Sequence, residues 1–194
     1  MNPEDHDTIA RLRERLRARR PATVRLDGFR AAAVLVPLCV LPDGLALLLT
    51  ERTADLPSHA GQVAFPGGKL DPDDADASAC ALREAAEELG IPADAAEVLG
   101  GLDDIPTPTG FVITPIVGLL ASSPQLSPNP AEVAATFYAP LATLRDPAVR
   151  EVRGVREFLG VSYEMLAYHI DGHLIWGATA RMVKQLLDLL EPAG

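Results

Sequence analysis

Cysteine is scarce in this chain, which contains only Cys39 and Cys80 among its 194 residues. Structural zinc sites use closely spaced cysteine pairs, and these two cysteines are too far apart in the sequence to form one. A fold built around a structural zinc ion is therefore excluded. Cys39 lies in an apolar run and Cys80 in a predicted helix, so we expect two buried thiols in a reducing compartment. A disulfide between them would also satisfy the count, but nothing in the sequence supports one.

Positive charge is also in short supply. Lys and Arg together number 17 against 27 Asp and Glu, which gives a formal net charge of −10. A surface that binds nucleic acid should be basic, so we expect no nucleic-acid partner. A small anionic substrate is still compatible with this charge, because bound metal ions can supply positive charge locally.

Long hydrophobic segments are absent as well. The run 31–41 is apolar but too short to span a bilayer. The N-terminal residues mix acids with arginines and lack the apolar core of a signal peptide. We therefore expect no membrane partner and a cytoplasmic location. With 48% hydrophobic residues and no internal repeat or linker, residues 1–194 are predicted to form a single domain.

The segment from Gly67 to Ile91 carries most of the residues with metal-binding chemistry. Its second half predicts a helix that stops at Gly90, with apolar residues at helical spacing on one face (Leu82, Ala85, Ala86 and Leu89). Three glutamates share the opposite face (Glu84, Glu87 and Glu88). Like charges on one face repel, and a bound cation would remove that penalty. The alternative for three glutamates alone is a solvated acidic face.

The same segment resembles the signature of the Nudix hydrolases. That pattern is Gly, five residues, Glu, seven residues, and then Arg-Glu-apolar-any-Glu-Glu-any-Gly-apolar. The second half matches at every fixed position (Arg83, Glu84, Ala85, Glu87, Glu88, Gly90 and Ile91). The first half departs from the pattern, because Asp74 stands where Glu is usual and lies one residue further from Arg83. Residues 68–91 are therefore taken as the Nudix box, and the role of Asp74 is left open.

An upstream motif narrows the resemblance. The residues Leu48-Leu49-Thr50-any-Arg52 are followed by His59-any-Gly61-any-Val63-any-Phe65-Pro66-Gly67-Gly68. This residue pattern resembles the extra motif of the coenzyme A pyrophosphatase branch of the Nudix family. The resemblance implies metal-dependent hydrolysis of the diphosphate of coenzyme A or its thioesters. The products would be 4′-phosphopantetheine, or its acyl form, and adenosine 3′,5′-bisphosphate.

The resemblance also suggests roles for individual residues. Glu84 and Glu88, one helical turn apart, are expected to bind Mg²⁺ or Mn²⁺ directly, because hard cations take oxygen ligands. Glu87 is expected to be a third ligand or to act through water, and the family suggests the backbone carbonyl of Gly68 as a further ligand. Arg83 is expected to pair with a box carboxylate and orient it.

The general base and the substrate contacts are less closely specified. Glu87, Glu88 and Glu132 are candidates for the base, with His59 as an outside candidate. Residues of the upstream motif are expected to contact coenzyme A (Arg52, His59 and Gln62). Two alternatives stay open: a Nudix pyrophosphatase for ADP-ribose, NADH or another nucleoside diphosphate derivative, and a catalytically silent Nudix domain that senses a nucleotide. A homodimer is also left open.

The remaining sequence predicts the elements around this box. A helical extension is expected over residues 1–20, with arginines in solvent or paired with acids. The pattern then indicates a hairpin around Pro42 to Gly44, strands at 98–102, 111–120 and 132–138, a second hairpin at Asp171-Gly172 and a final helix at 179–190. Strands with only a few helices favour an α/β fold, a mixed β-sheet with helices on both faces. The family implies the same α/β/α sandwich.

Overall fold

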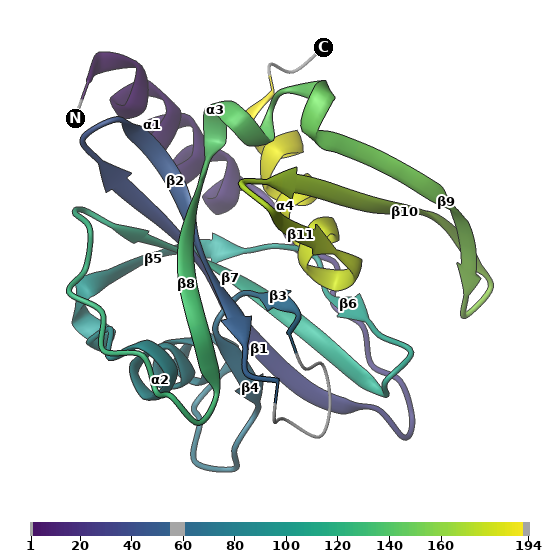
Figure 1. The fold of residues 1–194 in the computed structure, drawn as a ribbon. Coiled ribbons are helices and arrows are strands. Elements are labelled where there is room, and N and C mark those ends of the chain that lie inside the picture. Colours follow the sequence, from purple (N-terminus) through teal and green to yellow (C-terminus); the bar gives the residue numbers. More distant parts are fainter. Residues whose placement is uncertain (1, 55–60, 192–194) are drawn as a thin grey trace.

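A mixed sheet forms the centre of the computed structural model, which describes residues 2–54 and 61–191 (Figure 1). Over these residues the sheet has eight strands in the order β3-β2-β1-β7-β5, with β4 added on β1, β6 on β7 and β8 on β2. The strands are β1 (Arg30–Leu41), β2 (Gly44–Arg52), β3 (Val63–Ala64), β4 (Gly67–Lys69), β5 (Ala96–Gly101), β6 (Ile105–Pro106), β7 (Phe111–Leu120) and β8 (Val133–Pro140).

The predicted hairpin is confirmed as β1 and β2, with Leu41 opposite Gly44. The pairing of β1 with β7 is parallel, from Arg30 opposite Phe111 to Cys39 opposite Leu120. Each of the other pairs in this sheet is antiparallel. Parallel strands need a long crossover connection, and here the crossover contains β2 to β6 and the helix of the box.

Helices cover both faces of the sheet. Alternate residues of a strand point to opposite faces, so β1 contributes to two separate hydrophobic clusters. Val36 and Leu38 pack in the cluster with α1 (Pro3–Ala18) and α4 (Gly177–Leu190). Ala33 and Leu35 pack in the cluster with α2 (Ala77–Leu89). The predicted mixed sheet in an α/β/α sandwich is therefore confirmed.

The N-terminal helix packs on the rest of the chain through a narrow apolar stripe. Ile9, Leu12 and Leu16 are buried, and Leu12 is fully enclosed. Arginines at the edges of the stripe add polar contacts: Arg13 forms a two-pronged ion pair with Glu97, with N–O distances of 2.8 and 3.0 Å. Arg19 reaches the carbonyl of Gly101 and the carboxylate of Asp103. The arginines thus bind groups of the same chain, with α1 docked on the sheet.

A smaller sheet follows the central one. It contains β9 (Arg150–Phe158), β10 (Val161–Ile170) and β11 (His173–Trp176), and it is preceded by α3 (Leu141–Leu144) and a short 3₁₀ helix (Pro147–Val149). Asp171 and Gly172 make the predicted tight turn, with φ angles of 47° and 85° that suit a two-residue hairpin loop. The hairpin of β9 and β10 extends away from the body of the molecule (Figure 1).

The described helices include none that is long and apolar enough to cross a membrane. Both cysteines are free and buried, and burial raises the pKa of the Cys39 thiol to about 12. The expectation of two buried thiols is confirmed.

Replacing Leu12 with alanine tests how much the docking of α1 stabilises the fold. Loss of a fully buried leucine side chain should lower the free energy of unfolding by about 2–5 kcal/mol, measured by urea denaturation. Glu14→Ala, on the exposed side of the same helix, is the matched control and should change it by less than about 0.5 kcal/mol. Equal effects of the two substitutions would contradict the docking of α1.

Candidate active site

The box helix α2 is fixed at both ends by local backbone chemistry. The side chain of Asp76 caps its N-terminus and accepts hydrogen bonds from the backbone N–H groups of Ser78 and Ala79, at 2.8 and 2.9 Å. Gly90 ends it in the left-handed region, with φ of 70°. The predicted stop at Gly90 is confirmed. These caps set where the glutamates between them face.

The buried face of α2 differs from the predicted one. Leu82 and Ala86 are only half-buried, and the buried residues are Cys80, Ala81, Ala85, Glu88 and Leu89. The predicted face is confirmed for Ala85 and Leu89, and Leu82 packs against the same cluster. The buried face also extends to Cys80, Ala81 and Glu88, which the prediction left out, because alanines mark an apolar face weakly. This extension brings part of the glutamate face against the sheet.

The three glutamates consequently differ in exposure. The Glu88 side chain is 5% exposed and the Glu84 side chain 15%, whereas Glu87 is 59% exposed. A solvated acidic face therefore describes Glu87 alone. Burying carboxylates is costly unless they are paired or hydrogen-bonded, so the groups that surround Glu84 and Glu88 are decisive.

Gly68 leaves room for the Glu84 carboxylate. A Cβ atom at position 68 would lie 2.4 to 2.6 Å from the three carboxyl atoms of Glu84. The glycine of the box therefore acts by close approach, because its backbone φ needs no special freedom. The Glu84 carboxylate thus lies directly against the backbone of Gly68.

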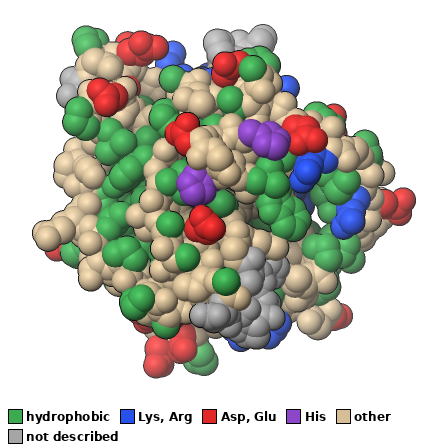
Figure 2. All heavy atoms as spheres, viewed as in Figure 1, with side chains coloured by type: hydrophobic (Ala, Val, Ile, Leu, Met, Phe, Trp, Pro, Cys, Tyr) green, Lys and Arg blue, Asp and Glu red, His purple; other side chains and the backbone are tan. Residues whose placement is uncertain are grey.

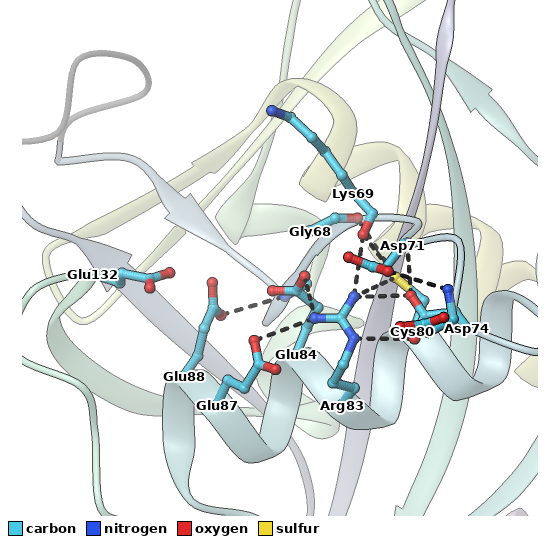
Figure 3. Close-up of polar contacts among 12 residues, drawn as sticks. Gly68, Lys69, Asp71, Asp74, Cys80, Arg83, Glu84, Glu87, Glu88 and Glu132 are labelled. Atoms are coloured by element: carbon cyan, nitrogen blue, oxygen red, sulfur yellow. Dashed lines mark hydrogen bonds and ion pairs between the residues drawn. The ribbon is translucent and has the colours of Figure 1, made fainter.

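Arg83 joins the acidic groups of the box (Figure 3). Its guanidinium donates to both carboxylate oxygens of Asp74, at 3.0 and 2.9 Å, to Glu84 at 2.9 Å and to Glu87 at 3.2 Å. It also donates to the carbonyl of Lys69 at 3.2 Å. The pairing with box carboxylates that the resemblance implies is present, and one cation thereby orients two glutamates and ties them to the loop.

Asp74 is the residue whose role the sequence left open. Its carboxylate accepts from Arg83 and from the backbone N–H of Asp71 at 2.8 Å. These hydrogen bonds, above all the one from Arg83, lower the pKa of Asp74 to about 2. Asp74 therefore stays ionised and positions Arg83, which gives a structural role to the residue that the sequence analysis left open.

Glu88 lies between groups of opposite charge. Arg52 of the upstream motif is 4.0 Å from its Oε1, and the backbone N–H of Gly67 donates to its Oε2 at 3.3 Å. Burial, and then the charge of Glu132, raise the pKa of Glu88 to about 7. Burial also raises the pKa of Glu84. Both shifts mean that burial makes the charged form of these carboxylates less favourable than it is in water.

Glu132 reaches the site from outside the box. It directly precedes β8, which pairs with β2 so that Val133 lies opposite Arg52. Figure 3 shows its carboxylate turned toward that of Glu88. The strand pairing thus places Glu132 next to Arg52, and α2 adds Glu88, 4.0 Å from Arg52.

The upstream motif folds back beside this group. The backbone N–H of Arg52 donates to the carbonyl of Gln62 at 3.0 Å, and that of Gly61 donates to the carbonyl of Arg52 at 3.1 Å. Arg52 and Gln62 are therefore adjacent, as their common prediction as substrate contacts requires. His59 lies outside the described residues.

The donors fit a hard divalent cation only in part. Over residues 2–54 and 61–191, no three His, Cys, Asp or Glu side chains converge as a ready-made metal site. The combination present is two buried carboxylates: Glu84, which lies against the backbone of Gly68, and Glu88, which accepts from the backbone N–H of Gly67. Mg²⁺ commonly binds through one or two carboxylates and completes its coordination with water and substrate phosphates. The raised pKa values and the room at Gly68 suit such a site.

Comparisons with known proteins identify the class. The NUDIX domain model matches residues 29–159. The chain is 44% identical over 165 residues to the "Uncharacterized Nudix hydrolase NudL" of Photorhabdus laumondii, covering 85% of this chain and 87% of that protein. It is 42% identical over 158 residues to the protein of the same description in Yersinia pestis, covering 81% and 78%. The chain therefore belongs to the Nudix hydrolase family.

Solved structures agree on the fold. The MutT/nudix family protein of Enterococcus faecalis aligns with a TM-score of 0.54 at 15% identity, over 97% of this chain and 69% of that one. The Nudix hydrolase RenU of M. smegmatis aligns with a TM-score of 0.51 at 24% identity, over 62% and 76%. At these identities the likeness supports the fold alone.

The buried Glu88 carboxylate should make the metal-free protein less stable as the pH rises. Its pKa of about 7 in the folded state lies above the ordinary glutamate value of 4.5. The folded state therefore binds the proton more tightly, and stability decreases between about pH 4.5 and 7. Chemical denaturation in EDTA across this range should show the decrease, and Glu88→Gln should reduce it.

Glu87→Gln is the matched control, because Glu87 is exposed on the same helix, and its pH profile should follow that of the unmodified chain. A Glu88→Gln profile that also follows the unmodified chain would contradict the buried, proton-binding state of Glu88.

Proposed function

We propose that this Nudix hydrolase cleaves the diphosphate of coenzyme A and its thioesters. The observation that supports this most directly is the position of Arg52. It belongs to the upstream motif typical of the coenzyme A pyrophosphatase branch, and it lies 4.0 Å from the box residue Glu88. The motif and the box therefore belong to one site, where a cation stands beside the carboxylates.

Divalent metal ions are general in Nudix hydrolases, and we propose Mg²⁺ or Mn²⁺ here, held by Glu84, Glu88 and the carbonyl of Gly68. Such an ion would neutralise charge on the diphosphate oxygens and make bound water more acidic. Glu87 is more exposed and is assigned a contact through water. This assignment uses the two buried carboxylates, whose charge the protein leaves least neutralised.

The residues of the chain have separate tasks in this reaction. Arg83 and Asp74 hold Glu84 in place, because the bidentate pairing of arginine with carboxylate restricts its orientation. Arg52 and Gln62 border the space where the diphosphate would enter. Glu132 is assigned as the acceptor of the proton from the attacking water, because it faces Glu88 without serving as a proposed ligand.

Water would attack one phosphorus of the diphosphate and the P–O bond to the bridging oxygen would break. One product keeps the pantetheine arm as 4′-phosphopantetheine or its acyl form. The other is adenosine 3′,5′-bisphosphate. The products together take up the elements of one water molecule.

A different nucleoside diphosphate substrate, such as ADP-ribose or NADH, would use the same carboxylates. The upstream motif favours coenzyme A over these. A catalytically silent sensor is the alternative from another class. It is disfavoured because a nucleotide sensor has no need to bury two mutually repelling glutamates.

The deciding experiment compares turnover of coenzyme A, ADP-ribose and NADH by the purified chain in Mg²⁺ or Mn²⁺, with products separated by chromatography. We expect 4′-phosphopantetheine and adenosine 3′,5′-bisphosphate from coenzyme A and poor turnover of the other two. Glu84→Gln, prepared identically, should reduce the rate by about a hundredfold or more, which excludes a contaminating hydrolase. Preference for ADP-ribose or NADH would reject the substrate, and no turnover at all would favour a sensor.

Gly68→Ala tests whether the position of the Glu84 carboxylate matters, because it changes the geometry of the site without removing any candidate ligand. The new Cβ would displace the Glu84 carboxylate, and turnover should fall by about 10- to 100-fold while every candidate ligand type remains. The free energy of unfolding should change little, because the displaced atoms end a flexible side chain.

Gly101→Ala is the matched control, since a Cβ there would meet its nearest atom at 3.5 Å, an ordinary contact. Turnover by Gly68→Ala equal to that of Gly101→Ala would refute the proposed closeness of Glu84 to the reacting groups.

A further inference from the structure

A cavity of about 430 Å³ lies apart from the glutamates, between the β9–β10 hairpin, the β6–β7 connection and the start of α4. This volume is in the range of about 300–1,000 Å³ that is typical of small-molecule sites. Much of its lining is apolar, including Ile105 and Met165. Figure 2 shows Lys and Arg side chains next to hydrophobic ones on this side of the molecule.

The cavity is separate from the box. Gly68 of β4 lies opposite Ala33 of β1, β1 pairs with β7, and β7 pairs with β6, so three strand spacings, about 14 Å, separate β4 from β6. Ile105 packs in the cluster of α1 and α4, on the opposite face from α2. The cavity therefore opens on the other face of the sheet.

The charge of the cavity opposes that of the whole chain. Three arginines line it, Arg153, Arg156 and Arg181, against the single acid Glu164. Arg153 is 3.4 Å from Glu151, whereas Arg156 and Arg181 form no ion pair with any described residue. In a chain with a net charge of −10, two arginines without acidic partners in one cavity indicate a place for an anion.

Aromatic groups stand beside these arginines. The guanidinium of Arg181 lies over the ring of Tyr163, 4.9 Å from its centroid. Trp176 also lines the cavity and is 44% exposed. Flat aromatic and guanidinium surfaces favour a ligand with a planar ring. The cavity thus combines groups for a phosphate with groups for a ring.

We propose that this cavity, lined by Arg153, Arg156, Arg181, Tyr163 and Trp176, binds a nucleoside phosphate at a second site, apart from the box. The phosphate contacts the arginines and the base packs against Trp176 or Tyr163. A polyanion such as nucleic acid is disfavoured, because the chain as a whole repels it and the cavity holds one small molecule. This site is independent of the proposed hydrolysis.

Trp176 provides the signal for the test, because it is the only tryptophan of the chain. The full chain in EDTA is titrated with adenosine 3′,5′-bisphosphate, and tryptophan fluorescence is followed. We expect a saturable change, which adenosine or inorganic phosphate alone reproduces only weakly. The same titration is repeated with AMP, and its affinity is compared with that of the bisphosphate. Tighter binding of the bisphosphate would link the site to the product of the proposed reaction, and equal binding would indicate a general nucleotide site; both support the proposal.

Variants assign the signal to the cavity. Arg156→Gln and Arg181→Gln should each weaken binding by about tenfold or more, through loss of a charge-assisted contact with the phosphate. Arg150→Gln removes the same charge from β9 outside the cavity lining and should leave the affinity unchanged. Glu84→Gln should also leave it unchanged, because the box lies on the other face.

Three results would overturn the proposal. They are no saturable change, equal affinities of the Arg156, Arg181 and Arg150 variants, or loss of binding in Glu84→Gln. A dimer in sedimentation that Arg156→Gln converts to a monomer would also overturn it, because a second copy of the chain would then occupy the cavity. Circular dichroism of each variant checks that it is folded, so that a loss of affinity cannot be due to unfolding.

Discussion

The candidate active site depends on the ion pairs of Arg83. One guanidinium contacts Asp74, Glu84 and Glu87, and without it Glu84 would have no ion pair with any residue that the structure describes. The arginine does not neutralise the whole group, since the pKa values of Glu84 and Glu88 are still raised by burial. The protein thus fixes the orientation of its carboxylates but leaves part of their charge unpaired. Burying such carboxylates costs stability, and a bound cation would offset part of that cost.

Patterns that act over a few residues were readable from the sequence. The β1–β2 hairpin, the strand Phe111–Leu120, the turn at Asp171 and the stop of α2 at Gly90 each depend on neighbouring residues, and the structure has them where they were expected. Pairing between distant segments was not readable in the same way. Nothing in β1 or β7 specifies their parallel register, because buried strands of this kind are apolar on both faces and carry no unique partner.

The site was predicted in its residues but not in its geometry. The resemblance supplied Arg83, Glu84, Glu87 and Glu88, yet the helix buries Glu88 rather than presenting all three glutamates alike. Spacing alone could not decide this, because alanines at 81, 85 and 86 allow more than one packing face. Asp74 shows the opposite case, in which a residue that departs from the family pattern still pairs with the arginine of the box. A shorter carboxylate one residue further away still reaches Arg83 with both oxygens.

The two faces of the sheet differ in charge, and this difference constrains what each can bind. Carboxylates collect on the α2 face, whereas two arginines that form no ion pair with a described residue, Arg156 and Arg181, lie near α4 on the other. The net charge of −10 acts over long distances and disfavours polyanions at either face, subject to screening by salt. Selection of a phosphorylated ligand would therefore have to come from short-range groups. On the α4 face these are the guanidinium groups that line the cavity, and on the α2 face the metal ion proposed beside Glu84 and Glu88 would supply the same positive charge within contact distance.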